Sequence, residues 1–177
     1  MDFREEFVAA WRQAYQDNPG LESFRARKKA LLWGVMGGFA LQKLIGLYVL
    51  GGMGGGGALI FGLFGAVMGL AIPGIFALAV WRGNWRFSLA LLLPAAYLLY
   101  DVVGNGFPAL ASGAGYHPAF YLILAVEGLL ALYLAGVVLW LSVPRRNREL
   151  GEIQNQVNER LIRRSKEIAA SAKQPKR

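Results

Sequence analysis

Apolar residues fall in four long runs along this chain, at about 30–50, 58–81, 87–107 and 118–143, with short polar or glycine-rich breaks between them. A helix rises about 1.5 Å per residue, so roughly 20 apolar residues cross the ~30 Å hydrocarbon core of a bilayer. The pattern predicts an all-α integral membrane protein with four transmembrane helices. The break at 82–86 is so short that the third helix must return beside the second, which favours an antiparallel four-helix bundle.

An amphipathic segment precedes the first run. Phe3, Phe7, Trp11 and Tyr15 recur at every fourth position, which predicts an N-terminal amphipathic helix that ends at Asn18-Pro19-Gly20. Two placements of this helix are open. It either lies in the headgroup region of the membrane or packs against the cytoplasmic face of the protein itself.

The region after Pro144 combines basic residues with apolar residues at helical spacing. It predicts a C-terminal cytoplasmic helix to about residue 170, with disorder at the last residues, 172–177. The chain thus divides into a cytoplasmic helix with a basic linker (1–29), a transmembrane domain (30–143) and a basic tail (144–177). The apolar positions of the tail helix are Leu150, Ile153, Val157, Leu161, Ile162 and Ile168.

Composition and charge place the chain in a bilayer and orient it. Hydrophobic residues make up 55% of the chain and charged residues only 17%, which is too apolar for a soluble domain. Of the 19 Lys and Arg residues, six precede residue 30, two lie in 82–86 and ten follow Pro144, whereas the other two breaks have none. Because cytoplasmic segments carry excess Lys and Arg, we expect a multi-pass protein of the bacterial cytoplasmic membrane with both termini in the cytoplasm. Tryptophans at the same ends of the runs agree with this: Trp33, Trp81, Trp85 and Trp140.

Three charged residues interrupt the apolar runs: Lys43, Asp101 and Glu127. Counted from the cytoplasmic ends at about 1.5 Å per residue, they lie at depths of roughly 20, 21 and 24 Å and so share one layer. Charge inside a membrane is costly, which makes each of them a functional candidate. Polar neighbours on the same helices complete the candidate layer: Gln42, Tyr97 and Asn105.

Two interpretations of this layer are open. In the first, the three charges line a polar cavity that binds an ion or small polar solute, or that exchanges a proton at Asp101 or Glu127. In the second, the Lys43 ammonium lies between the two carboxylates and forms an interhelical ion pair that fixes the register of the helices. The sequence does not distinguish these interpretations.

Glycines at small-xxx-small spacing predict close helix packing. Gly34 and Gly38 have this spacing, as do Gly65 and Gly69, and Gly62 lies on a neighbouring line. The simplest interpretation is that these glycines let the first and second transmembrane helices approach each other. A homodimer interface is the alternative.

Other signals point away from enzyme chemistry. The chain has no cysteine, and its one histidine, His117, has no second histidine with which to form a metal site. The glycine-rich segment at 51–57 lacks the Gly-Lys-Ser/Thr ending of a phosphate-binding loop. We expect no catalytic activity, no cofactor and no bound metal.

The expected partners follow from the same features. No nucleic-acid recognition motif surrounds the basic tail, so no nucleic acid is expected, and anionic inner-leaflet lipids explain its charge. Two functions are in view. One is a small transporter, channel or membrane subunit that handles an ion or small polar solute through the Lys43, Asp101 and Glu127 layer. The other is a noncatalytic scaffold or regulatory subunit whose terminal helices bind a cytoplasmic partner.

Overall fold

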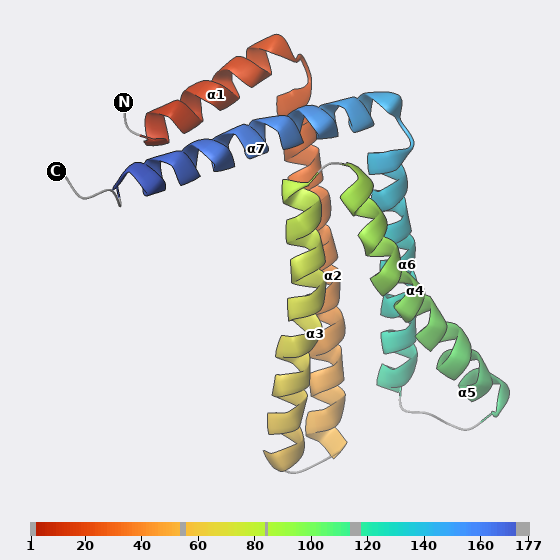
Figure 1. Ribbon diagram of the computed structural model, residues 1–177. Helices are drawn as coiled ribbons and strands as arrows, with labels where there is room; N and C mark the ends of the chain where they lie inside the picture. The colour runs from red at the N-terminus through yellow and green to blue at the C-terminus, as the bar shows by residue number, and fades with distance from the viewer. Residues whose placement is uncertain (1–2, 54–55, 84, 114–117, 173–177) are drawn as a thin grey trace.

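The computed structural model describes residues 3–53, 56–83, 85–113 and 118–172, which are helical almost throughout and contain no strand (Figure 1). The tail was expected to be disordered at 172–177, but Ala172 ends the last helix, and residues 173–177 lie outside these ranges, as does the loop residue His117. The elements are α1 (Phe3–Asp17), α2 (Leu21–Met53), α3 (Gly56–Arg82), the 3₁₀ helix η1 (Trp85–Leu91), α4 (Leu92–Asp101), the π-helical turn η2 (Val102–Gly106), α5 (Phe107–Ala111), α6 (Pro118–Ser142) and α7 (Arg145–Ala172).

Four helical stretches are long and apolar enough to cross a membrane: Leu21–Val49, Gly62–Arg82, Trp85–Ala111 and Pro118–Ser142. The prediction of an all-helical chain with four such stretches is confirmed. Large apolar side chains face outward along them, as Phe64 and Ile75 do on α3 with 69% and 67% of their surface exposed. Such a surface is typical of helices that lie in lipid rather than in water.

The first of these stretches differs from its predicted form. The segment 21–29 was expected to be a basic linker, but it forms the first turns of α2. Gly20 adopts a positive φ of 98°, which reverses the chain after α1 and lets a new helix begin at Leu21. The basic residues that follow are good helix formers, and nothing between Leu21 and Ala30 interrupts the helix.

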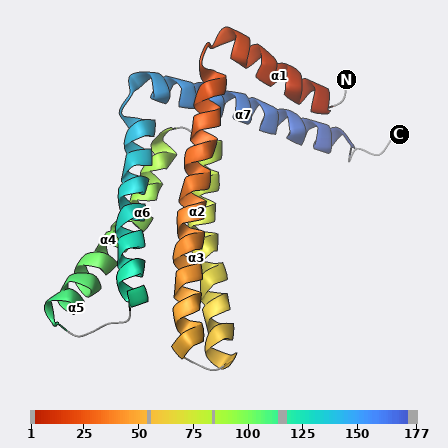
Figure 2. The ribbon, with the colours of Figure 1, turned by 180° about the vertical axis from the view of Figure 1, so that it is seen from behind.

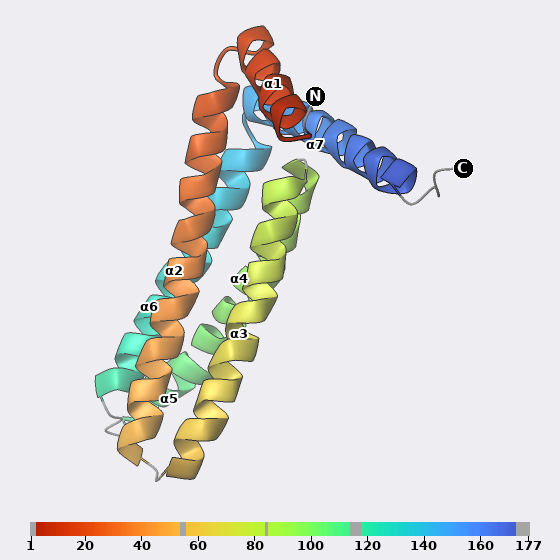
Figure 3. The ribbon, with the colours of Figure 1, turned by 90° about the vertical axis from the view of Figure 1, so that its left-hand side faces the viewer.

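The four stretches pack as two pairs, which meet at two places. α2 and α3 lie side by side, α6 packs against both α2 and α4, and the third stretch meets α3 through η1. Figure 3 shows α2 and α3 adjacent along their length. From behind, α4 and α5 diverge from α6 toward the end opposite α1 and α7 (Figure 2). The third and fourth stretches are therefore closest to each other near the terminal helices.

The glycines serve different contacts from those expected. Gly34 and Gly38 face α6: a Cβ atom on Gly38 would lie 2.6 Å from Leu130 Cδ1, and one on Gly34 would collide with the Tyr133 hydroxyl. They therefore let the first and fourth stretches approach. Of the two predicted glycines Gly65 and Gly69, Gly69 faces α2, as expected, and lies against the Lys43 side chain, whereas nothing lies within 4 Å of a Cβ atom on Gly65. Gly62 is half-buried.

The terminal helices α1 and α7 form a layer across one end of the other helices, nearly perpendicular to them (Figures 1 and 2). Trp11 of α1 and Leu161 of α7 belong to the buried core. Beyond that core, Arg164 Nε lies 3.1 Å from Glu6 Oε2, and hydrogen bonding to this guanidinium lowers the pKa of Glu6. The two helices continue together past α2 and α3.

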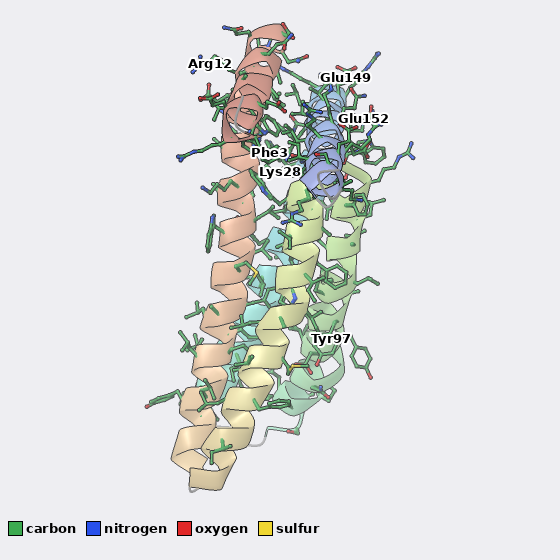
Figure 4. All side chains as sticks on the ribbon, turned by 60° about the vertical axis from the view of Figure 1, so that its left-hand side comes forward. Phe3, Arg12, Lys28, Tyr97, Glu149 and Glu152 are labelled. Atoms are coloured by element: carbon green, nitrogen blue, oxygen red, sulfur yellow. The ribbon has the colours of Figure 1, made fainter. Side chains whose placement is uncertain are left out.

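A buried lysine joins this layer to the helices below it. Lys28 is only 1% exposed and lies beneath α7 (Figure 4). Its ammonium donates to the Gly83 carbonyl at 3.3 Å and to Gln154 Oε1 at 3.4 Å. Gln154 Nε2 in turn donates to the Trp81 carbonyl at 2.7 Å, and Asn158 donates to the Arg82 carbonyl. Side chains of α7 thus bind the last carbonyls of α3, which lack partners within that helix, and Lys28 of α2 binds the carbonyl of the next residue.

We predict that Gln154→Ala destabilises the protein. It removes one acceptor from the buried Lys28 ammonium and the donor to the Trp81 carbonyl, and each buried group left unsatisfied costs about 1–3 kcal/mol. The measurement is equilibrium unfolding in detergent, followed by circular dichroism. Gln156→Ala, at an exposed position of the same helix, is the control. Equal stability of the two variants would show that Gln154 does not stabilise this junction.

Candidate functional site

The polar residues predicted at one depth come from three helices. Gln42 and Lys43 lie on α2, Asp101 ends α4 and Glu127 lies in the first half of α6. Gln42 and Glu127 are buried, with 8% and 4% of their surfaces exposed. Gln42 Nε2 donates a hydrogen bond to Glu127 Oε1 at 2.5 Å. This bond joins the first and fourth stretches inside an otherwise apolar packing.

The remaining charges gather around Glu127. Asp101 and Lys43 lie close enough to interact electrostatically with its carboxyl group. Asn105 donates a hydrogen bond to Asp101 Oδ1, one turn further along. Asp101 and Lys43 are half-buried and Asn105 is exposed. We call Gln42, Lys43, Asp101, Asn105 and Glu127 the polar layer.

Tyr97 does not join the polar layer. It is 69% exposed and points away from the other helices (Figure 4). The sequence placed Tyr97 one turn before Asp101 on the same stripe, but the two side chains face different surroundings. Its ring belongs to the outward-facing surface of α4.

The helix that carries Asp101 changes its pitch at the polar layer. Asp101 ends α4, and the next five residues, Val102–Gly106, form a π-helical turn. Pro108 lacks an N–H group and cannot bond the carbonyl four residues before it, which accounts for a wider turn at this place. Gly106 is buried against Leu124, where a Cβ atom would lie 3.0 Å from the nearest methyl carbon. Such turns are frequent at functional sites because they shift the direction of the side chains around them.

Two oxygen atoms of the polar layer have no hydrogen-bond partner among the described residues. They are Gln42 Oε1 and Glu127 Oε2, both buried. Each is an acceptor, and a buried acceptor without a donor costs free energy. The formal charges of the layer also favour a positively charged ligand, because two carboxylates and one ammonium leave one negative charge in excess. The chemistry of this layer therefore suits a proton or a small cation.

Spacing along α2 explains why Gln42 is buried. The buried face of this helix repeats at intervals of three or four residues, as expected of one side of a helix. The face also contains Lys28, which the sequence analysis counted only as one charge of a basic segment. Continuing the apolar spacing of the first run backward would have found it. The face consists of Leu21, Phe24, Lys28, Leu32, Val35, Phe39 and Gln42.

We predict that Gln42→Leu destabilises the protein by about 1.5–3 kcal/mol, the usual range for a hydrogen bond to a charged group, because it removes the donor to Glu127. Thermal unfolding in detergent, with helix content as the signal, measures the effect. Tyr97→Phe is the control, since it also removes a polar group from a membrane-length helix, but at an exposed position. If Gln42→Leu unfolds at the wild-type temperature, Glu127 does not depend on this amide.

Comparisons with protein-family models, with curated proteins and with solved structures found no match to this chain. A fold by itself does not imply an activity, so the side chains of the polar layer carry the functional argument.

Proposed function

We propose that this protein is a small transporter, channel or membrane subunit that binds a proton or a monovalent cation in the polar layer. The observation that carries the proposal is the pair of unpartnered buried acceptors, Gln42 Oε1 and Glu127 Oε2. A proton on Glu127 Oε2 would turn that oxygen into a donor, and a cation bound beside either oxygen would satisfy it. An anion would instead add to the negative charge already in excess.

The exposure of three residues decreases in order toward Glu127, which supports a route by which a cation could reach this site from the surface. Asn105 is exposed, Asp101 is half-buried and Glu127 is buried. The hydrogen bond from Asn105 to Asp101 and the electrostatic contact of Asp101 with Glu127 connect them. A cation moving along this series would meet a carboxylate at each step inward. Lys43 supplies the resident positive charge that keeps the site from holding the cation too tightly.

The orientation that we propose places α1 and α7 in the cytoplasm of a bacterial cell, with the four stretches as an antiparallel bundle across the inner membrane. The basic N-terminal segment, the linker at 82–86 and the basic tail meet at the same end of the described structure (Figure 1). Lys and Arg concentrate in cytoplasmic segments of membrane proteins. In this orientation the exposed Asn105 lies toward the outer side.

We predict that the purified protein in proteoliposomes conducts protons or sodium ions and that Glu127→Gln abolishes the flux, because the variant keeps the shape of the side chain but loses its charge. A pH-sensitive dye inside the vesicles reports proton entry under an imposed potential, and a sodium-sensitive dye reports sodium entry in parallel. Asp101→Asn should reduce the same flux.

Glu152→Gln is the matched control, because it neutralises an exposed carboxylate on α7. Its flux should equal that of the wild type. Wild-type flux no greater than that of protein-free vesicles, or flux unchanged in both Glu127→Gln and Asp101→Asn, would contradict the proposal. In the second case the polar layer is a structural ion pair.

A second candidate function is supported by the terminal layer. α1 and α7 extend past the other helices (Figure 2), and four large apolar side chains of these two helices are exposed: Phe7 (43%), Val8 (49%), Ile162 (50%) and Ile168 (38%). A noncatalytic scaffold or regulatory subunit would use such a surface to bind a cytoplasmic protein.

The test of the scaffold function is purification in mild detergent followed by identification of associated proteins. We predict that Phe7→Glu and Ile162→Glu each remove a partner that the wild type retains, because a buried charge without a partner is costly at an interface. Arg12→Ser changes an exposed polar residue of α1 and should retain the partner. Identical sets of associated proteins for all variants would contradict this function.

A further inference from the structure

A hollow of about 530 Å³ opens between α2 and α3 next to the terminal layer. Lys29, Trp33 and Met36 of α2 form one side, and Gly74, Leu78 and Trp81 of α3 form the other. We call it the α2/α3 groove. Its volume is within the range of roughly 300–1,000 Å³ that is usual for small-molecule sites. It lies away from Glu127 and plays no part in the polar layer.

The walls of the α2/α3 groove are apolar along nearly their whole length. Trp33 and Leu78 project outward, with 68% and 48% of their surfaces exposed. Gly74 leaves room between the helices, because a Cβ atom there would lie 3.6 Å from Met36 Cε, and a longer side chain would enter the groove. The shape suits a flexible apolar chain that lies along both helices.

A lysine side chain lies at the end of the α2/α3 groove near the terminal layer. Lys29 is exposed and forms no ion pair with any residue that the structure describes. Two neighbouring cations are already engaged: Lys28 is buried with its acceptors, and the Arg25 guanidinium lies 3.5 Å from the Trp11 ring centroid. Arg27 is exposed, but it does not line the groove. An anionic group above the groove would therefore pair with Lys29.

We propose that the α2/α3 groove binds one phospholipid with an anionic headgroup from the leaflet at this end. One acyl chain occupies the apolar groove, and the phosphate pairs with Lys29. Trp33 and Trp81 lie where such a lipid passes from chain to headgroup, which is the depth that tryptophan prefers. The bound lipid contacts both α2 and α3 and so adds to their packing. Charge complementarity with Lys29 selects it over a zwitterionic lipid.

Tryptophan quenching by brominated acyl chains tests this proposal in the full-length protein. Nanodiscs receive a small fraction of brominated phosphatidylglycerol among plain phosphatidylcholine, or brominated phosphatidylcholine at the same fraction among plain phosphatidylglycerol. The expected result is that the anionic quencher is roughly fivefold more effective in the wild type. Trp81→Phe should reduce the quenched fraction, because this ring lines the groove.

Substitutions distinguish binding of a lipid in the groove from general electrostatic attraction between basic residues and anionic lipids. Lys29→Gln should remove the preference for the anionic quencher, whereas Arg27→Gln, an exposed basic residue two positions earlier, should keep it. Gly74→Leu should reduce quenching by both lipids, and Gly74→Ala gives a milder change should the larger side chain prevent folding.

Two results would overturn the proposal. One is equal quenching by both lipids in the wild type, or an equal effect of Lys29→Gln and Arg27→Gln. The other is occupation of the groove by a second copy of the chain. Because the protein has no cysteine, Trp33→Cys would then form a disulfide-linked dimer under oxidation.

Discussion

Polar groups buried away from water must find partners within the chain, and this constraint governs the first long helix. The buried face of α2 carries two such residues, Lys28 near one end and Gln42 further along. Each reaches a different helix: Lys28 bonds to the end of α3 and to Gln154 of α7, and Gln42 bonds to Glu127 of α6. α2 is therefore the element to which the other long helices are joined by polar contacts as well as by packing.

The two polar contacts differ in how completely they are satisfied. Lys28 has two neutral acceptors, and Gln154 also bonds the Trp81 carbonyl, so both side chains of the junction beneath α7 have hydrogen-bond partners. In the polar layer, Gln42 Oε1 and Glu127 Oε2 have no partner among the described residues. The first arrangement is what a structural contact requires. The second has capacity for one more positive charge, which is why the functional proposal rests there.

The terminal layer and the α2/α3 groove follow from the Lys28 junction. By holding α7 across the ends of α2 and α3, the junction sets the boundary between the apolar helices and the polar terminal helices. Lys29, the next residue on α2, points in a different direction from Lys28 and is exposed beside the groove. Adjacent lysines thus have opposite roles, because successive residues of a helix point about 100° apart. One joins helices within the protein, and the other is exposed beside the groove, where we propose that it pairs with a lipid headgroup.

The sequence by itself determined the number of membrane-length helices. Each needs a run of about 20 apolar residues, and such a run can be recognised in the sequence without knowledge of tertiary contacts. It also predicted one depth for Lys43, Asp101 and Glu127, because a regular α-helix rises about 1.5 Å per residue. Only the tertiary structure decided which side chains meet, because this depends on how each helix is rotated about its axis. Rotation turned Tyr97 outward, brought Gly34 against α6 rather than α3 and buried Lys28 among neutral acceptors. These outcomes arise from packing between segments distant in the chain, which local spacing does not encode.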